Sequence, residues 1–334
     1  MLQVRLDAFG GPDELHPVEV PDPVPGPGQV LVRTAAAGIT FVETQVRAGR
    51  PPWPGPPPAL PVVLGNGVEG DIIGLGEGVD PSWLGRRVVT ATGGFGGYAD
   101  RVVVDAAAAV AVPDGLGLGE AVALLADGRT ALGLVRAASL TPGDRVLVTA
   151  AAGGVGTLLV QLAKAAGVRQ VVAAAGGGRK LALAAGLGAD TTVDYTKPGW
   201  ADALEGLDVG FDGVGGQVGA DLLAAMAQMG HGGRYLVYGG AGGPMTAGDA
   251  VTARGITLVP GHTVVRSPED NRSLVEQALA MGAAGRLRPV IGQRFPLAAA
   301  ADAHRAIEAR QTVGKTILIP AGRSSPARPG SGRG

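Results

Sequence analysis

A glycine-rich turn between a short strand and a helix carries the clearest chemical signal in this sequence. A strand is expected over 145–150, the turn reads Ala151-Ala152-Gly153-Gly154-Val155-Gly156, and apolar residues then recur at helical spacing up to Gly167. Glycine lets the backbone approach a pyrophosphate, and the free N–H groups of the helix's first turn face that anion. A second strand over 171–175 completes a βαβ unit of dinucleotide-binding length. The alternative is a turn that only packs helix on strand, since the full G-x-G-x-x-G pattern is absent.

The residues after the second strand indicate which dinucleotide is bound. NAD-binding units usually place Asp or Glu there to hold the ribose 2′-hydroxyl. This chain has no acidic residue between Asp144 and Asp190, and instead offers Gly176-Gly177-Gly178 followed by Arg179 and Lys180. The small residues leave room for a 2′-phosphate, and the cations would pair with it. The sequence therefore predicts NADP(H), with a merely solvated helix start as the alternative reading of Arg179 and Lys180.

The composition excludes several other function classes. The 334 residues suggest about two domains, and a formal net charge of -1 gives no basic field for nucleic acid or an anionic membrane. Cysteine is absent and the four histidines form no ligand pair, so disulfides, thiolate catalysis and metal binding are not expected. No apolar run is long enough to cross a bilayer, and the chain starts as a strand and not as a signal peptide. We therefore expect a cytoplasmic protein.

The first third of the chain reads as a β-rich domain. Strands are expected over 2–6, 29–36, 62–76, 86–90 and 97–104, with a short helix within 38–49. The proline-crowded segment from Pro51 to Pro61 is expected to form a stiff loop that presents Trp53. Glycines between 65 and 76 indicate a tightly curved, barrel-like sheet.

The pattern changes near Pro113 to strands that alternate with helices. Helices are expected over 119–125, 129–138 and 221–229, and strands over 191–194, 209–212, 234–238 and 256–259. Such alternation is typical of a parallel, doubly wound sheet. Helices over 267–281 and 298–309 and a strand over 314–319 are expected to return to the first domain. The tail from Ala321 to Gly334 contains mainly Gly, Ser, Pro and Arg and is expected to be disordered.

In order and spacing these segments resemble the medium-chain dehydrogenase/reductase superfamily, specifically its zinc-free quinone oxidoreductase (zeta-crystallin-like) branch. The resemblance covers about residues 1–319. It is carried jointly by 28–32, 38–44, 62–65, 76–79, 96–99, 127–131, 151–156, 186–190, 211–216 and 313–315. It implies an α/β fold with a GroES-like substrate domain at 1–118, a Rossmann NADP(H)-binding domain at 119–261 and a return to the substrate domain at 262–320. It also implies a homodimer joined through the Rossmann sheets.

The same resemblance implies where the cofactor binds. Thr130 and the 40–44 segment would lie near the nicotinamide. Gly153, Gly154 and Val155 would hold the pyrophosphate. Gly176, Lys180 and Tyr195 would surround the 2′-phosphate, next to the Arg179 already singled out by the sequence. Tyr238, Gly239 and Gly240 would line the nicotinamide ribose, with His262 and Thr263 close by.

The segment expected near the substrate departs from the family pattern Asn-Phe-x-Asp-Thr-Tyr-x-Arg. Thr40 stands for the asparagine, Glu43 for the aspartate and Gln45 for the tyrosine. Related enoyl-thioester reductases are thought to use a tyrosine from this region as a proton donor, which Gln45 cannot replace well. Thr40, Glu43 and Gln45 are therefore candidate catalytic or substrate-lining residues. The alternatives are ordinary helix-start polarity for Thr40 and Gln45, and for Glu43 an ion pair with Arg47 one helical turn on.

Together these features predict an NADPH-dependent oxidoreductase that transfers hydride to a quinone or another conjugated carbonyl acceptor without a metal. One alternative is an enone or enoyl reductase of a biosynthetic pathway. Another is a sensor or regulatory protein that binds NADPH with little turnover. The expected partners are a small-molecule acceptor and a second copy of the chain, with no nucleic acid and no membrane.

Overall fold

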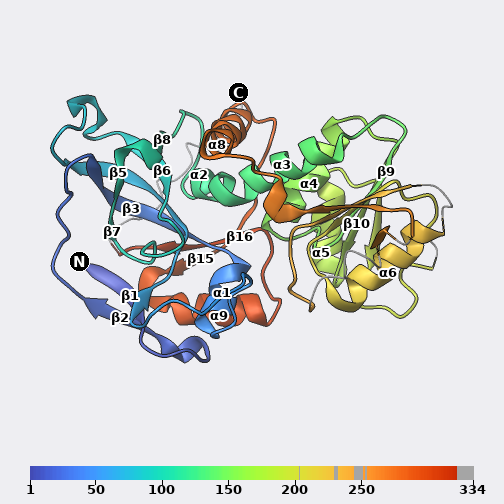
Figure 1. Cartoon of the computed structure of the whole chain (residues 1–334), viewed down its shortest axis with the longest axis horizontal. Helices are drawn as coiled ribbons and strands as arrows, with labels where there is room; N and C mark the ends of the chain where they lie inside the picture. The colour runs from blue at the N-terminus through green and yellow to red at the C-terminus, as the bar shows by residue number, and fades with distance from the viewer. Residues whose placement is uncertain (203, 229–231, 244–250, 253, 322–334) are drawn as a thin grey trace, which may run out of the picture.

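The computed structural model has two domains side by side, at the left and right of Figure 1. It describes residues 1–321 except 203, 229–231, 244–250 and 253. The predicted α/β class is confirmed, because one domain is built on largely antiparallel sheets and the other on a parallel sheet. Within these described residues no helix is both long and apolar enough to cross a bilayer.

Both ends of the chain contribute to the first domain. Its larger sheet has the order β15-β16-β3-β5-β6-β8, with β7 paired to β3, and its smaller sheet has the order β2-β1-β4. The strands are β1 (Leu2–Leu6), β2 (Leu15–Glu19), β3 (Gln29–Ile39), β4 (Val62–Val63), β5 (Gly67–Leu75), β6 (Arg87–Ala91), β7 (Arg101–Asp105), β8 (Ala109–Ala111), β15 (Ile291–Pro296) and β16 (Lys315–Ile319). Helices α1 (Phe41–Arg47) and α9 (Ala300–Glu308) contact each other at one end of this domain. The domain core is formed by alternate strand residues such as Val30, Val32 and Ile72.

The second domain is a six-stranded parallel sheet of order β11-β10-β9-β12-β13-β14. Counted within the domain this is 3-2-1-4-5-6, the strand order of a Rossmann fold. Its elements are β9 (Arg145–Val148), α4 (Gly154–Ala165), β10 (Gln170–Ala175), α5 (Gly178–Gly186), β11 (Thr191–Asp194), β12 (Val209–Asp212), α6 (Gly216–Ala227), β13 (Arg234–Val237) and β14 (Thr257–Pro260). The order reverses between β9 and β12, so a ligand is expected at the carboxyl ends of these two strands.

One continuous helical run joins the two domains. It consists of α2 (Glu120–Ala123), the π-helical η4 (Leu124–Gly128) and α3 (Arg129–Ala138). Helix α2 contacts β3, β5 and β6 of the first domain, whereas α3 contacts α4 and β13 of the second. Two separate helices over 119–125 and 129–138 were expected from the sequence. A wider π-turn bridges them instead, and such turns occur frequently at functional sites.

Helix α8 (Pro268–Ala283) bears on the predicted domain boundaries. It contacts η4 and α3, and Figure 1 shows it beside this helical run. The chain then reaches the first domain through β15, α9 and β16, which contact one another, and β16 pairs with β3. The boundaries at 118 and 261 stay predictions, and we propose that the return to the first domain begins after α8 and not at residue 262.

Several elements differ from the sequence prediction for local reasons. Helix α6 begins at Gly216, five residues before the expected start, because glycines obscure its first turn. Met229, the expected end, lies outside the described residues, as do 322–334 of the tail. Strand β15 was not predicted, since its residues are only partly buried and show no clear alternation. The short 3-10 helices are η1 (Pro12–Glu14), η2 (Pro81–Trp83), η3 (Ala106–Ala108), η5 (Gly261–Thr263) and η6 (Leu297–Ala299).

Candidate active site

The predicted glycine turn lies at the carboxyl end of β9. Helix α4 begins after Gly153, which occupies the N-cap position without any side-chain capping bond. The first N–H groups of such a helix have no intrahelical partner and attract an anion. Gly153 also forms a parallel bridge with Gly314, whose N–H donates to the carbonyl oxygen of Ala152 at 2.7 Å. The anion-binding turn therefore lies at the junction with the segment that leads into β16.

Gly156 in this turn is required by close backbone packing. A Cβ at this position would overlap the carbonyl oxygen of Ala150 and lie 2.9 Å from Cα of Ala151. We expect Gly156→Ala to lower the free energy of unfolding by about 1–3 kcal/mol. The matched control is Gly186→Ala in α5, where a Cβ meets nothing within 4 Å and alanine favours the helix by about 0.5–1 kcal/mol. Urea unfolding of both variants tests this, and equal stability of Gly156→Ala and wild type would contradict it.

The residues predicted for the 2′-phosphate gather at the carboxyl end of β10. Lys180, in the first turn of α5, donates from Nζ to the carbonyl oxygen of Arg310 at 2.7 Å. Burial lowers the pKa of Lys180, and the charges of Arg310 and Arg179 lower it further. Tyr195 lies beside Gly176, since a Cβ on that glycine would be 3.5 Å from the tyrosine ring. Gly176, Lys180 and Tyr195 are therefore together, while Arg179 is exposed next to them.

Arg310 is a candidate site residue that sequence reasoning missed. It lies between α9 and β16, and it is 130 residues from Lys180 along the chain. Its Nη2 donates to the carbonyl oxygen of Ala241 at 3.1 Å, and its φ of 56° is in the left-handed region. A non-glycine residue in that region is a marker of functional segments. The signal that points to Arg310 is its backbone conformation, which cannot be seen in the sequence.

An acidic side chain lies near the end of β10 after all, but it comes from the neighbouring strand. Asp194 ends β11 and is paired in register with Ala175, the last residue of β10. Its carboxylate accepts hydrogen bonds from the N–H and hydroxyl of Thr196 at 3.0 and 2.7 Å. These bonds lower the pKa of Asp194. Asp194 lies outside the stretch between Asp144 and Asp190, and only the parallel pairing of β10 with β11 brings it to this strand end.

A buried network fixes the carboxyl ends of β9, β12 and β13. The hydroxyl of Tyr238 donates to the carbonyl oxygen of Thr149 at 2.7 Å, and Oγ1 of Thr149 donates to Asp212 at 2.9 Å. Asp212 also accepts from the hydroxyl of Tyr235 at 2.5 Å. Burial and then the charge of Asp212 raise the pKa of Tyr238, so its phenol stays protonated as a donor. Tyr238 thus anchors the strand ends, and the half-buried pair Gly239–Gly240 follows it at this edge.

Thr40 and Glu43 form a capping box at the start of α1. Glu43 is only 3% exposed and accepts from the N–H of Thr40 at 2.5 Å, from the Thr40 hydroxyl and from the N–H of Asn66 at 2.9 Å. Arg47 pairs instead with Glu308, so the ion pair considered between Glu43 and Arg47 is wrong. Burial raises the pKa of Glu43, against the opposing effects of the Thr40 hydrogen bond and the charge of Lys315.

A buried ion pair lies directly over the glycine turn. Nζ of Lys315 in β16 is 3.1 Å from Oδ1 of Asp127 in η4, and both side chains are almost fully buried. A Cβ on Gly154 would overlap the Asp127 carboxylate, so this carboxylate touches the start of α4. Thr130 follows Asp127 by three residues and is half-buried. Glu43, Lys315 and Asp127 thus bring charge from three segments of the chain to one place.

The other predicted residues make no described contact with the glycine turn or with Lys180. His262 and Thr263 lie in η5 directly after β14 and are exposed. The Thr263 hydroxyl donates to the carbonyl oxygen of Pro260 at 2.7 Å. Gln45 is half-buried on α1. Their roles toward cofactor or substrate stay predictions.

Comparison with known proteins identifies the family. A model of the alcohol dehydrogenase GroES-like domain matches residues 26–114, and a model of zinc-binding dehydrogenases matches residues 187–318. A quinone oxidoreductase of Pseudomonas aeruginosa is 33% identical over 330 residues, which cover 95% of this chain and 99% of that protein. This chain belongs to the zinc-independent quinone oxidoreductase branch of the medium-chain dehydrogenase/reductase superfamily.

Two further relatives of this quinone oxidoreductase-family chain bear on its chemistry. A 2-haloacrylate reductase of a Burkholderia species is 30% identical over 326 residues, covering 93% of this chain and 96% of that protein. The structure of Escherichia coli quinone oxidoreductase complexed with NADPH superposes with a TM-score of 0.86 at 27% identity, covering 96% of this chain and all of that one. The predicted GroES-like and Rossmann architecture and the predicted cofactor, NADP(H), are thereby confirmed.

The site fits this cofactor, and this chain is an NADPH-dependent oxidoreductase. The uncapped start of α4 offers N–H groups to a pyrophosphate, and Lys180 with Arg310 offers positive charge at the adenosine end. The sequence has no cysteine, and in the part of the chain that the structure describes, no group of three or more metal-ligating side chains exists. The word zinc in the family model's name therefore corresponds to no cysteine ligand here.

Proposed function

We propose that this oxidoreductase transfers hydride from NADPH to a quinone or to another conjugated carbonyl acceptor. The observation that supports the proposal most is the relationship to a quinone oxidoreductase over 95% of the chain. Within the chain, Phe41 and Val42 at the start of α1 directly follow Thr40 and are more than a third exposed. Such apolar side chains next to a hydroxyl suit a flat, conjugated carbonyl compound.

Bound NADPH supplies the hydride, and the protein's own residues bind and orient it. The N–H groups after Gly153 would hold the pyrophosphate. Lys180 and Arg310 would pair with the 2′-phosphate. Thr130 and the segment around Thr40 would position the acceptor beside the nicotinamide, which makes the transfer effectively unimolecular.

We propose that Thr40 donates a hydrogen bond to the acceptor's carbonyl oxygen and that Glu43, through Thr40, supplies the proton. In the structure the Thr40 hydroxyl bonds to Glu43, and a protonated Glu43 can reverse this bond so that the hydroxyl hydrogen faces the acceptor. The hydride adds to the acceptor's carbon, the proton to its oxygen, and Glu43 regains a proton from water afterwards. A quinone needs this help less, since water can protonate its reduced oxygens.

This relay predicts a change in the pH profile. Glu43 must be protonated to act, so enone reduction should fall as pH rises through its raised pKa. The ionisable groups facing it are Lys315 from β16 and Tyr98 from the segment before β7. Glu43→Gln should lower kcat for an enone by about 10²–10⁴-fold and abolish that pH limb, with a smaller effect on a quinone. Glu77→Gln, at an exposed glutamate between β5 and η2 of the same domain, is the matched control. An unchanged pH limb in Glu43→Gln would refute the role.

A second candidate function is enone or acrylate reduction. The specific observation in its favour is the relative named 2-haloacrylate reductase, which is 30% identical over nearly all of the chain. The capping arrangement of Thr40 and Glu43 would serve such an acceptor better than a quinone, because an enolate must be protonated. Both candidates share the cofactor and differ in the acceptor.

The deciding experiment follows NADPH oxidation at its absorbance band against 1,4-benzoquinone, naphthoquinones, α,β-unsaturated ketones and 2-chloroacrylate, with NADH in parallel. Turnover of quinones supports the main proposal. Turnover of only the enones or the acrylate replaces it with the second. NADPH binding without turnover of any acceptor would contradict both.

We also propose the homodimer expected from the sequence. Among the residues that the structure describes, β14 is the outer strand of the parallel sheet, and its residues 258–260 are only half-buried. An outer strand with free backbone groups is suited to pairing with a second copy. Light scattering on the purified protein measures this directly, and a monomer at micromolar concentration would contradict it.

A further inference from the structure

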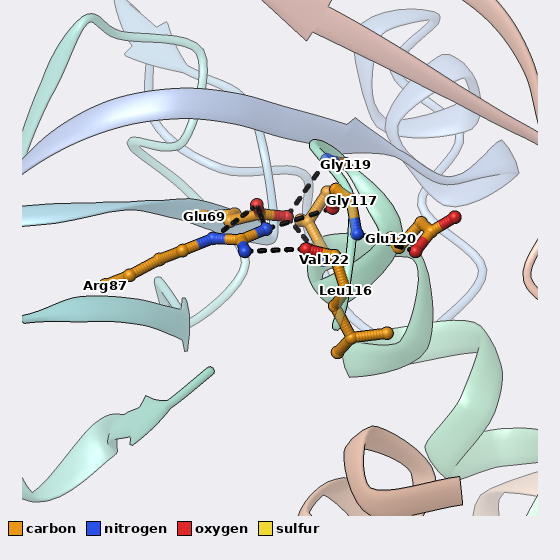
Figure 2. Close-up of polar contacts among 7 residues, drawn as sticks. All are labelled: Glu69, Arg87, Leu116, Gly117, Gly119, Glu120 and Val122. Atoms are coloured by element: carbon orange, nitrogen blue, oxygen red, sulfur yellow. Dashed lines mark hydrogen bonds and ion pairs between the residues drawn. The ribbon is translucent and has the colours of Figure 1, made fainter. Parts of the chain in front are cut away.

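A buried carboxylate holds the beginning of the helical run that joins the domains. Glu69 of β5 is fully buried, and its Oε2 accepts from the N–H groups of Gly119 and Val122 at 3.1 and 3.3 Å. Arg87 of β6 donates to the other carboxylate oxygen. Figure 2 shows these contacts at the start of α2. The sheet of the first domain thereby fixes the beginning of the helical run through a charged group and not only through apolar packing.

The arginine of this clamp also fixes the connecting segment before the helix. Arg87 Nη1 donates to the carbonyl oxygen of Leu116 at 2.7 Å, and Nη2 donates to that of Gly117 at 3.0 Å. Figure 2 shows the guanidinium between Glu69 and these two carbonyls. Apart from the bonds between Arg87 and Glu69 themselves, the hydrogen bonds of the clamp join strands β5 and β6 to residues 116–122, from which the chain continues into η4 and α3.

A second clamp of the same construction holds the opposite end of the run. Arg234 of β13 donates to the carbonyl oxygens of Ala138 and Ser139 and is 2.5 Å from Oδ1 of the nearly buried Asp144. All residues of this second clamp lie at or after the end of α3, within the second domain. It therefore resembles the first clamp in chemistry, but it bridges no domains and lies away from the glycine turn.

We infer that Glu69 and Arg87 are positioning residues for the reaction, because they set where η4 and α3 place Asp127 and Thr130 against the glycine turn. The run is continuous from residue 120 to 138, so a displacement of its first turn is transmitted to residues 127 and 130. The Asp127 carboxylate is packed against the backbone of Gly154, so closely that a Cβ there would overlap it. A small displacement of Asp127 would therefore change this contact. The inference rests on NADPH as cofactor and not on which acceptor is reduced.

The ionised state of Glu69 depends on the clamp being complete. Burial raises the pKa of Glu69, whereas Arg87 and the two N–H donors oppose that effect. A buried carboxylate that loses its arginine is left without charge compensation and will rearrange or take up a proton. Lysine cannot replace Arg87, since it lacks the planar fork that reaches a carboxylate and two carbonyls together.

The test compares the two clamps in the full chain. Glu69→Gln and Arg87→Lys alter the first, and Asp144→Asn and Arg234→Lys alter the second in the same way. For each variant the melting temperature, the Kd of NADPH by fluorescence titration and the single-turnover rate of NADPH oxidation by 1,4-benzoquinone are measured. We expect all four to melt earlier. Only Glu69→Gln and Arg87→Lys should slow the single-turnover step, by about tenfold to a hundredfold, or weaken NADPH binding tenfold or more.

The outcomes separate positioning from a general loss of stability. If all four variants lose rate in proportion to their melting temperatures, or if Glu69→Gln and Arg87→Lys keep wild-type rate and Kd, the inference is wrong. If Glu69→Gln does not fold, Arg87→Lys decides, since it retains the positive charge. If wild-type protein does not reduce benzoquinone, the proposed acceptor is wrong, and the NADPH Kd still tests the clamp.

Discussion

Replacing both Lys180 and Arg310 by alanine should remove the enzyme's preference for NADPH over NADH. A charge-assisted hydrogen bond to a phosphate contributes about 1.5–3 kcal/mol, which corresponds to roughly 10–100-fold in affinity for each cation. NADH lacks the 2′-phosphate, so its KM should change little. Steady-state kinetics with both nucleotides at several NaCl concentrations measures the effect, and the salt dependence of the NADPH KM should decrease in the double variant.

The single variants test whether the two cations act independently, and a distant lysine provides the control. Lys180→Ala alone should also loosen Arg310, because its Nζ donates to the carbonyl oxygen of that residue. The two effects should therefore not be additive. Lys164→Ala is the matched control, since Lys164 is an exposed lysine of the same domain whose partner, Asp190, precedes β11 at the amino edge of the sheet. A double variant that still prefers NADPH tenfold or more would remove both residues from the 2′-phosphate site.

The free energy of unfolding should fall by about 3 kcal/mol between neutral pH and about pH 4, mainly because of one histidine. His304 of α9 is fully buried with Nε2 2.9 Å from the Tyr98 hydroxyl. Burial, and then the charge of Arg47, lowers the pKa of His304 from 6.5 to about 3. The unfolded chain takes up a proton at His304 below about pH 6.5 that the folded protein does not. Stability is therefore present above this pH and is lost on acidification toward pH 3.

Urea unfolding at a series of pH values measures this slope. His304→Gln keeps a group that can bond to Tyr98 but cannot be protonated, so its stability should depend much less on pH. His16→Gln is the control, because His16 is exposed on β2. If His304→Gln and wild type show the same slope between pH 7 and pH 4, another group causes the acid sensitivity.

The fold was largely predictable because its signals are local. The βαβ unit around Gly153 combines a β-branched strand, a glycine turn and an amphipathic helix, each readable within a few residues. Alternation of strand and helix predicts a doubly wound parallel sheet, but the order 3-2-1-4-5-6 comes from the structure, because a flavodoxin-like order has the same alternation. The π-turn over Leu124–Gly128 was not predictable, since nothing in those residues differs in pattern from an ordinary helix.

The candidate site was predictable only where its residues follow one another in the chain. Gly153–Val155, Gly176 and Lys180 lie within one motif and were found. Arg310 precedes β16 and Lys315 begins it. They contact Lys180 and Asp127, which are 130 and 188 residues away along the chain, and the sequence does not indicate such distant contacts. The burial of Glu43 was likewise missed, because a glutamate in the first turn of a helix is ordinarily exposed.

The position of β16 in the sheet has a consequence for how the chain is made. This strand is the last element among the residues that the structure describes, yet it lies between β15 and β3 in the first domain's main sheet. During synthesis the second domain, from α2 to α8, leaves the ribosome as one uninterrupted segment and can fold early. The first domain must keep β3 without one neighbour until residues 315–319 emerge, when Lys315 also reaches Asp127. A nascent chain interrupted before residue 315 would therefore carry a folded nucleotide-binding domain and a first domain that lacks one strand of its main sheet.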